Sequence, residues 1–150
     1  MRGDIYSPFA GRAKEYAWSL CLKNAPRKIT PTDIDYMTEC NGHFLFFEMK
    51  TEGAKMPYGQ QLAFERLLLS LPNRAVLMLV THTSVAVVNM PANLKNLELW
   101  VSNGLTIRRR EKVAPELFTQ LYAAFFRWAE GDRKAFRRVL TLSSSMARAA

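Results

Sequence analysis

Residues 33–50 read DIDYMTECNGHFLFFEMK and contain two apolar-rich runs separated by Asn41-Gly42. Asn-Gly between two strand-like runs is the strongest short-range signal for a β-hairpin, because a type I′ turn needs positive φ angles at both central residues. The stretch therefore predicts a hairpin whose loop is Asn41-Gly42. In that hairpin Cys40 lies opposite His43, and this pair sets the register of every pair further along.

This register brings four charged side chains together on one face of the hairpin. Asp35 lies opposite Glu48, and Asp33 lies opposite Lys50. Side chains alternate between the two faces of a strand, so all four are expected to project from the same face. Directly opposed Cβ atoms lie about 4.5–5.5 Å apart. Two carboxylates at that separation repel each other unless a proton or a cation lies between them.

A divalent metal ion suits an acid pair of this kind. Mg²⁺ prefers oxygen ligands and is commonly held by one or two carboxylates, several waters and a substrate phosphate. Lys50 shares the face with Glu48 and can reach a metal-bound water or a phosphate oxygen. The pattern therefore predicts a site that hydrolyses phosphodiesters, with Asp35 and Glu48 as metal ligands. Glu-x-Lys is also a common chance tripeptide, and the alternative is a solvated strand end with an Asp33–Lys50 salt bridge.

Three segments carry a wider pattern: residues 30–35 (TPTDID), 47–50 (FEMK) and 58–60 (YGQ). Together they resemble the PD-(D/E)XK nuclease superfamily, the restriction-endonuclease-like group that includes Holliday-junction resolvases and many phage-encoded nucleases. The resemblance covers residues 29–70, with a continuation through residue 90. It implies a mixed sheet flanked by helices, a motif Asp and Glu that bind Mg²⁺ or Mn²⁺, and a Lys that assists the attacking water.

The motif aspartate has two candidates. The family's Pro-Asp pair is contiguous, whereas Pro31 here precedes Asp33 by two positions. We assign Asp35 as the motif residue because it opposes Glu48 in the proposed register and is followed by apolar residues. Asp33 stays a candidate second metal ligand. Many nucleases of this family carry a Glu on their first helix that reaches the metal, so the resemblance implies this role for Glu15, with a surface Glu paired to nearby basic residues as the alternative.

Gln60 is a further candidate for the site. It lies at the start of a predicted helix, beside the buried face, where its amide must find hydrogen-bond partners. In several subfamilies of the resembled group, a Gly-Gln pair after the Glu-x-Lys strand lies near the metal or the nucleic-acid backbone. Gln61, which is placed at helical spacing to pair with Glu65, is the alternative candidate.

The hydrophobic pattern beyond the hairpin predicts an α/β (α+β) fold with a central mixed β-sheet flanked by helices, and the resemblance implies the restriction-endonuclease-like version of it. The continuous apolar run over 75–81 is typical of a strand covered on both faces, and the helix before it makes a crossover beside the hairpin. We expect one domain over 1–142 and a flexible tail over 143–150. The predicted helices cover 8–24, 59–71 and 115–130, and the predicted strands after the hairpin cover 75–81, 85–90, 97–101 and 105–110.

Charge favours a polyanionic partner. The 21 Lys and Arg outnumber the 13 Asp and Glu, for a formal net charge of +8. Such an excess is typical of proteins that bind nucleic acid, although ordinary basic proteins share it. Arg108, Arg109 and Arg110 are consecutive on a predicted strand and are placed to track a phosphate backbone, with an edge strand protected by charge as the alternative interpretation. The candidate contacts to the DNA backbone are Lys55, Arg108, Arg109, Arg110, Arg133 and Arg137.

Composition also excludes several classes of protein. No apolar run reaches the roughly 20 residues of a membrane-spanning helix. The first residues lack the apolar core of a signal peptide, so we expect a cytoplasmic protein. The resemblance to the nuclease superfamily implies that the cell is bacterial or phage-infected. The two cysteines show no zinc-ligand spacing.

These observations predict a Mg²⁺- or Mn²⁺-dependent deoxyribonuclease, with branched recombination or repair intermediates as candidate substrates. Its catalytic residues are Asp35, Glu48, Lys50 and Gln60. One alternative is a basic protein that binds nucleic acid without cutting it. Another is an interaction protein that uses the helix over 115–130. The aromatic stripe of that helix is interpreted as core, with a homodimer interface as the alternative; it comprises Phe118, Tyr122, Phe125 and Phe126.

Overall fold

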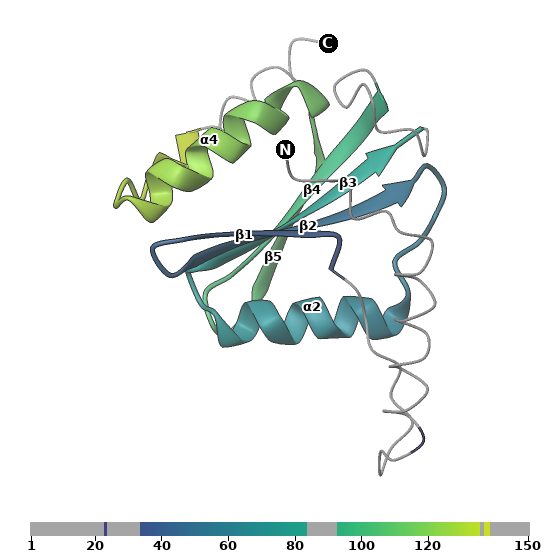
Figure 1. Ribbon diagram of the computed structural model, residues 1–150, viewed down its shortest axis with the longest axis horizontal. Coiled ribbons are helices and arrows are strands. Elements are labelled where there is room, and N and C mark those ends of the chain that lie inside the picture. Colours follow the sequence, from purple (N-terminus) through teal and green to yellow (C-terminus); the bar gives the residue numbers. More distant parts are fainter. Residues whose placement is uncertain (1–22, 24–33, 84–92, 136, 139–150) are drawn as a thin grey trace, which may run out of the picture. The chain divides into compact units, whose positions relative to one another are not determined.

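A five-stranded mixed sheet with a helix on each face forms the framework of the described residues, which are 23, 34–83, 93–135 and 137–138 of the computed structural model. All the elements belong to one unit of the chain, Ile34–Ala150. In chain order they are β1 (Tyr36–Cys40), β2 (His43–Thr51), α2 (Tyr58–Ser70), β3 (Ala75–His82), β4 (Leu94–Ser102), β5 (Ile107–Val113), the 3-10 helix η2 (Pro115–Leu117) and α4 (Phe118–Ala129), as drawn in Figure 1.

The predicted hairpin is confirmed in position and in register. Strands β1 and β2 pair antiparallel, from Cys40 opposite His43 to Tyr36 opposite Phe47. Asn41 and Gly42 have φ angles of 48° and 73°. Both angles are positive, as the two-residue loop requires.

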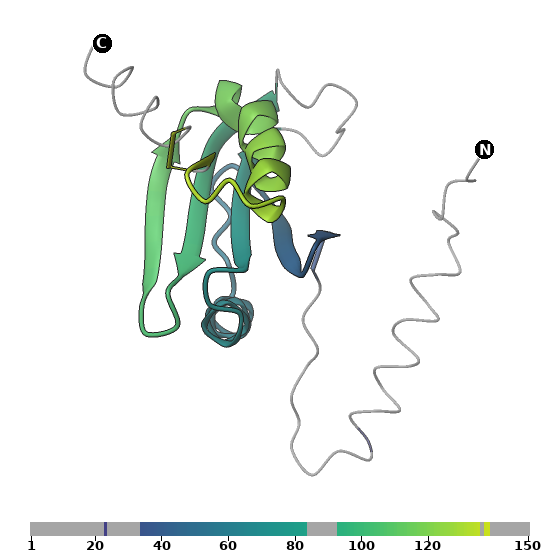
Figure 2. The ribbon, with the colours of Figure 1, turned by 90° about the vertical axis from the view of Figure 1, so that its left-hand side faces the viewer.

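The remaining strands extend the sheet on one side only of the hairpin. Strand β3 pairs parallel with β2, so α2 makes the predicted crossover between them. Strands β4 and β5 then add antiparallel, giving the order β1-β2-β3-β4-β5. Figure 2 shows the strands in this order, with β1 and β5 at the two edges. The predicted second hairpin is β4–β5, whose four-residue loop is closed by Asn103 Oδ1, which accepts from the amides of Leu105 and Thr106 at 3.0 and 2.9 Å.

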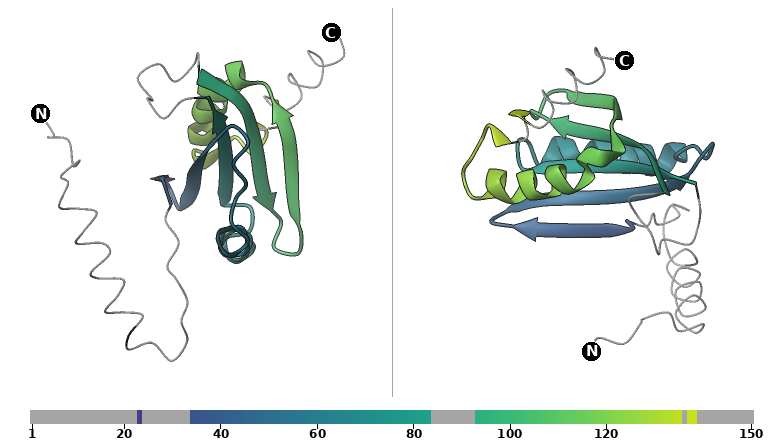
Figure 3. Two further views of the ribbon diagram at one scale, coloured as in Figure 1. Left: turned by 90° about the vertical axis from the view of Figure 1, so that its right-hand side faces the viewer. Right: turned by 90° about the horizontal axis from the view of Figure 1, so that it is seen from above.

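The alternation of side chains along β2 divides the core into two layers, and Figure 3 shows the sheet lying between the two helices. Leu45 and Phe47 belong to the cluster beneath α4, whereas Phe46 belongs to the cluster beneath α2. Because the period is two residues, Glu48 and Lys50 lie on the same face as Phe46, beneath α2. The sheet therefore presents the Glu-x-Lys motif to the first turn of the crossover helix.

The aromatic stripe predicted for the helix over 115–130 is core only in part, because Phe125 is buried whereas Tyr122 is exposed. Leu121, Ala124 and Phe125 of α4 are fully buried in the cluster between this helix and the sheet. Phe118 and Phe126 are partly buried and pack against the same cluster. Tyr122 keeps 38% of its surface exposed. No helix in the described part of the chain is long and apolar enough to cross a membrane.

Several predictions fall outside the described residues. These are the helix over 8–24 with Glu15, Asp33, the strand over 85–90 and the tail over 143–150. The helix predicted over 59–71 is confirmed as α2, and the strands predicted over 75–81, 97–101 and 105–110 correspond to β3, β4 and β5.

Candidate functional site

Glu48 is a carboxylate buried within the sheet. Glu48 is only 2% exposed, and its cross-strand neighbour in β3 is Leu79. Glutamate is almost never fully buried unless it is paired, because an isolated charge loses its hydration. A buried Glu that directly follows the apolar run 44–47 therefore marks a position where the chain holds a carboxylate at a cost in stability.

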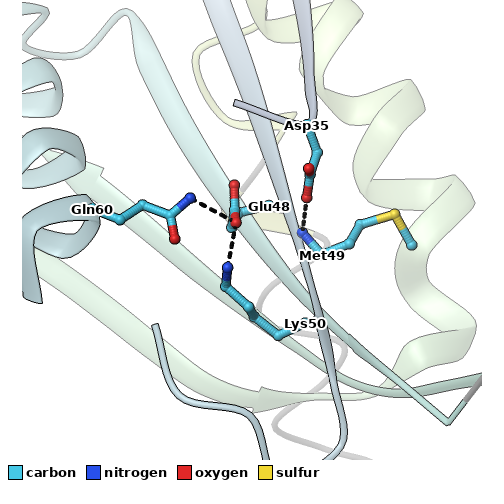
Figure 4. Close-up of polar contacts among 5 residues, drawn as sticks. All are labelled: Asp35, Glu48, Met49, Lys50 and Gln60. Atoms are coloured by element: carbon cyan, nitrogen blue, oxygen red, sulfur yellow. Dashed lines mark hydrogen bonds and ion pairs between the residues drawn. The ribbon is translucent and has the colours of Figure 1, made fainter. Parts of the chain in front are cut away.

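One oxygen of that carboxylate receives two donors. Lys50 Nζ lies 2.6 Å from Glu48 Oε1, and Gln60 Nε2 donates to the same oxygen at 2.7 Å. Figure 4 shows the lysine approaching along β2 and the glutamine reaching across from α2. Charge-assisted bonds of this length are among the strong hydrogen bonds of proteins. Strand and helix thus fix the orientation of the Glu48 carboxylate from two directions.

The other oxygen of Glu48 has no such partner. Oε2 is buried and accepts no hydrogen bond within the described residues. Leaving a buried acceptor unsatisfied costs about 1–3 kcal/mol, and more when the group is charged. An anionic oxygen with free lone pairs is the ligand type that Mg²⁺ and Mn²⁺ prefer, so the donor chemistry at this position fits a divalent cation.

Asp35 lies next to Glu48 along the hairpin but orients its carboxylate differently from the prediction. It directly precedes β1, whose pairing with β2 ends at Tyr36 opposite Phe47, so the predicted Asp35–Glu48 pair lies beyond the observed ladder. Its Oδ2 accepts a hydrogen bond of 2.7 Å from the amide of Met49 (Figure 4). Backbone N–H groups of a strand point along the plane of the sheet, so this oxygen lies at the sheet edge instead of over the face that carries Glu48. The expectation that Asp35 shares that face is therefore corrected for this oxygen.

The predicted acid pair stands without a third ligand among the described residues. Within that part of the chain, no group of three or more His, Cys, Asp or Glu side chains is arranged to hold a metal ion. Asp33 and Glu15, the two further metal candidates, lie outside the described residues. The carboxylates available for a cation here are those of Asp35 and Glu48.

Arg109, one of the predicted DNA contacts, is held by contacts within the protein. Its guanidinium lies 3.8 Å from the centroid of the Trp100 ring and forms an ion pair with Glu65. Its charge is therefore engaged within the protein. Of the remaining candidates, Arg110 is half-buried. The others are exposed; they are Lys55, Arg108, Arg133 and Arg137.

The structure adds polar residues that the sequence interpretation missed. Glu98 Oε1 accepts a 2.5 Å hydrogen bond from Trp100 Nε1 on the same face of β4. The link between Glu65 and Arg109 joins residues far apart in the chain, so no local pattern could indicate it. One local signal did predict part of this network, because Gln61 Nε2 donates to Glu65 Oε1 at 2.9 Å.

Comparison with known proteins leaves the family unassigned. Searches of protein-family models, curated proteins and solved structures find no significant match to the chain. Function must therefore be argued from the chemistry that Asp35, Glu48, Lys50 and Gln60 can perform.

Proposed function

We propose that the chain is a deoxyribonuclease that requires Mg²⁺ or Mn²⁺ and has a restriction-endonuclease-like fold. The observation that carries the proposal is the Glu48 carboxylate, buried in β2 with one oxygen held by Lys50 and Gln60 and the other without a donor among the described residues. A buried carboxylate oxygen that accepts no hydrogen bond lowers the stability of the fold. Binding of a ligand to Glu48 Oε2 is therefore the physical reason for its presence.

The arrangement of elements supports the same assignment. The Asp35 position, the Glu-x-Lys strand and the helix carrying Gln60 follow one another along the chain, as the resemblance to the PD-(D/E)XK superfamily implies. Glu48, with Asp35 beside it, would hold the cation. When bound, the cation would supply an activated water and neutralise charge on the scissile phosphate.

Lys50 is placed to act on the phosphate side of the site. Its side chain is 20% exposed, against 3% for the side chain of Glu48, so the ammonium lies at the boundary between the buried carboxylate and solvent. From there it can stabilise negative charge that develops on a phosphate or orient the attacking water.

Gln60 has a supporting role in this proposal. By donating to Glu48 Oε1 it fixes the rotation of the carboxylate and thereby the direction of Oε2. A ligand oxygen held in advance need not reorganise when the cation and substrate bind.

Exposed basic side chains would supply affinity for the DNA backbone. The net charge of +8 and the exposed Lys55 and Arg108 suit contacts to phosphates, which position a duplex without reading its sequence.

A second candidate function is nucleic-acid binding without cleavage. It is favoured by the hydrogen bond between Asp35 Oδ2 and the Met49 amide, which engages this oxygen within the hairpin instead of with a cation beside Glu48. In that case the Lys50–Glu48 pair is a partly buried structural ion pair.

Cleavage assays with Glu48→Gln separate the two candidates. Linear duplex, single-stranded and four-way-junction DNA are incubated with Mg²⁺, Mn²⁺ or EDTA, and DNA binding is measured in parallel. Cleavage by the wild type that is lost both in EDTA and in Glu48→Gln, with DNA binding retained, supports the nuclease. Salt-sensitive binding with no cleavage under any condition supports the non-catalytic protein. Cleavage that survives in Glu48→Gln overturns the site assignment.

A further inference from the structure

We propose that Arg109 and Glu65 are positioning residues for Gln60: they fix helix α2 over the sheet so that the Gln60 amide meets Glu48. The expected effect on turnover rests on the proposed nuclease function. The geometric effect on Gln60 does not, and it can be measured without any activity.

Arg109 has both its planar face and its charge engaged. Trp100 lies directly opposite it in the β4–β5 pairing, and the guanidinium stacks 3.8 Å from the ring centroid. The same guanidinium forms the ion pair with Glu65 of α2. A planar, permanently charged group is needed for both contacts at once, and lysine provides only the charge.

Trp100 is a rigid platform for this arginine. Its ring is buried in the cluster beneath α2, at 3% exposure. Its Nε1 is held by the hydrogen bond to Glu98. The ring therefore cannot follow Arg109 if the arginine moves, and the stack fixes where the guanidinium meets α2.

Glu65 connects Arg109 to the first turn of α2. Its Oε1 accepts from Gln61, one helical turn earlier and adjacent in sequence to Gln60. The start of α2 has no side-chain cap and no acidic residue in its first turn. Among the described polar contacts of α2, Gln60 ties the helix to β2, and Glu65 ties it to β5.

The Gln60–Glu48 and Glu65–Arg109 contacts both limit the rotation of α2 about its axis. Side chains extend about 5–6 Å from a helix axis, so a rotation of about 10° displaces a side chain by about 1 Å. A displacement of about 1 Å in a catalytic group can lower turnover by about 10²-fold. An ion pair on β5 can thus control the bond between Gln60 and Glu48 on β2, although neither Arg109 nor Glu65 touches the carboxylate.

NMR of the side-chain amide of Gln60 tests the geometry directly in the full chain. The resonances are assigned by their loss in Gln60→Ala. We expect Arg109→Ala and Glu65→Ala each to shift them toward the positions of solvent-exposed amides. Arg109→Lys keeps the charge, and its shift should be intermediate. Arg108→Ala removes the same charge from the neighbouring, exposed position and is the matched control, with no shift expected.

Two results would overturn the proposal. One is unchanged Gln60 resonances in a folded Arg109→Ala variant, with folding checked by the dispersion of the methyl spectrum. If Arg109→Ala does not fold, the same criterion applies to Glu65→Ala and Arg109→Lys. The other is an equal shift in Arg108→Ala, which would make the effect one of net charge.

Kinetics supply an independent arm through a double-mutant cycle. We expect Arg109→Ala to lower kcat by about 10-fold, within the range that small misplacements produce. In the Gln60→Ala background the same substitution should have no further effect on kcat, because the residue it positions is gone. Multiplying losses would contradict the proposal. If the wild type cleaves no DNA, the nuclease function fails while the NMR result still decides the positioning role.

Discussion

Gln60 Nε2 of helix α2 and Glu48 Oε1 of strand β2 are joined by a buried hydrogen bond of 2.7 Å. The bond crosses from the crossover helix to the strand that precedes it, and Lys50 donates to the same oxygen. Both donors therefore meet one oxygen of Glu48, and the second oxygen is left without a donor among the described residues. A cation would find its ligand at this second oxygen, and the roles of the neighbouring side chains can be tested one at a time.

Asp35→Asn separates a ligand role from a structural role at this position. An asparagine oxygen can still accept a hydrogen bond from the Met49 amide, so the protein should keep its melting temperature. The substitution removes the negative charge, and we expect most of the metal-dependent cleavage to be lost because the cation loses one of its two anionic ligands. Thermal denaturation and cleavage rates are measured on the same sample. Full cleavage by Asp35→Asn would show that Asp35 serves only to hold the strand.

Lys50→Met should change metal affinity and turnover in opposite directions. The ammonium lies 2.6 Å from the carboxylate that would hold the cation, so its removal eliminates a competing positive charge and lowers the Kd for Mn²⁺. Turnover should fall by about 10²–10³-fold because a group that stabilises phosphate charge is removed. Calorimetric titration with Mn²⁺ and cleavage rates give the two values. Lys95→Met, at an exposed position of β4 that has no assigned role in the site or in DNA contacts, is the control, and a matching loss of turnover there would contradict the assignment.

Gly42→Ala and Gly59→Ala should change stability with opposite signs. A Cβ added at either glycine meets nothing within 4 Å, so only the backbone decides the outcome. Gly42 has φ 73°, and alanine there should lower the free energy of unfolding by about 1 kcal/mol. Gly59 lies in the first turn of α2, where alanine should raise the free energy of unfolding by about 0.4–1 kcal/mol. Urea denaturation measures both, and a stabilised Gly42→Ala would contradict the turn geometry.

Arg108→Ala should reduce the salt dependence of DNA binding. The side chain is exposed on β5, and removing one phosphate interaction should lower the slope of log K against log salt by about 0.9 for duplex DNA. Fluorescence anisotropy at several salt concentrations measures the slope. An unchanged slope would remove Arg108 from the DNA interface.

Local signals predicted the part of the fold that local chemistry decides. Asn41-Gly42 fixed the hairpin register because few other dipeptides accept positive φ at both positions. The apolar stripe of α2 and the continuous apolar run of β3 predicted their types because burial sets those periods. Gln60 was placed beside the site by the same stripe, and it is buried, at 9% exposure.

The orientation of two side chains could not be predicted in this way. A strand register specifies which Cα atoms face each other, but not that Asp35 turns its carboxylate to the Met49 amide just before β1 begins. Alternation along a strand places Arg109 on the face opposite Arg108, but it does not specify that Trp100 lies across from Arg109. The pairing partner of Arg109 depends on the four-residue loop between β4 and β5. Further along β5 the pairing becomes irregular at Lys112, whose φ is 56°.

The parallel pairing of β2 with β3 through α2 has a consequence for how the site assembles. Asp35, Glu48, Lys50 and Gln60 all come from one short span, residues 35–60, so the sequence separations that must close are small. Short closures cost little entropy, and low contact order favours fast folding. The local contacts of the acidic centre can therefore form early in folding, whereas the final orientation of α2 over the sheet waits for Trp100 of β4 and Arg109 of β5.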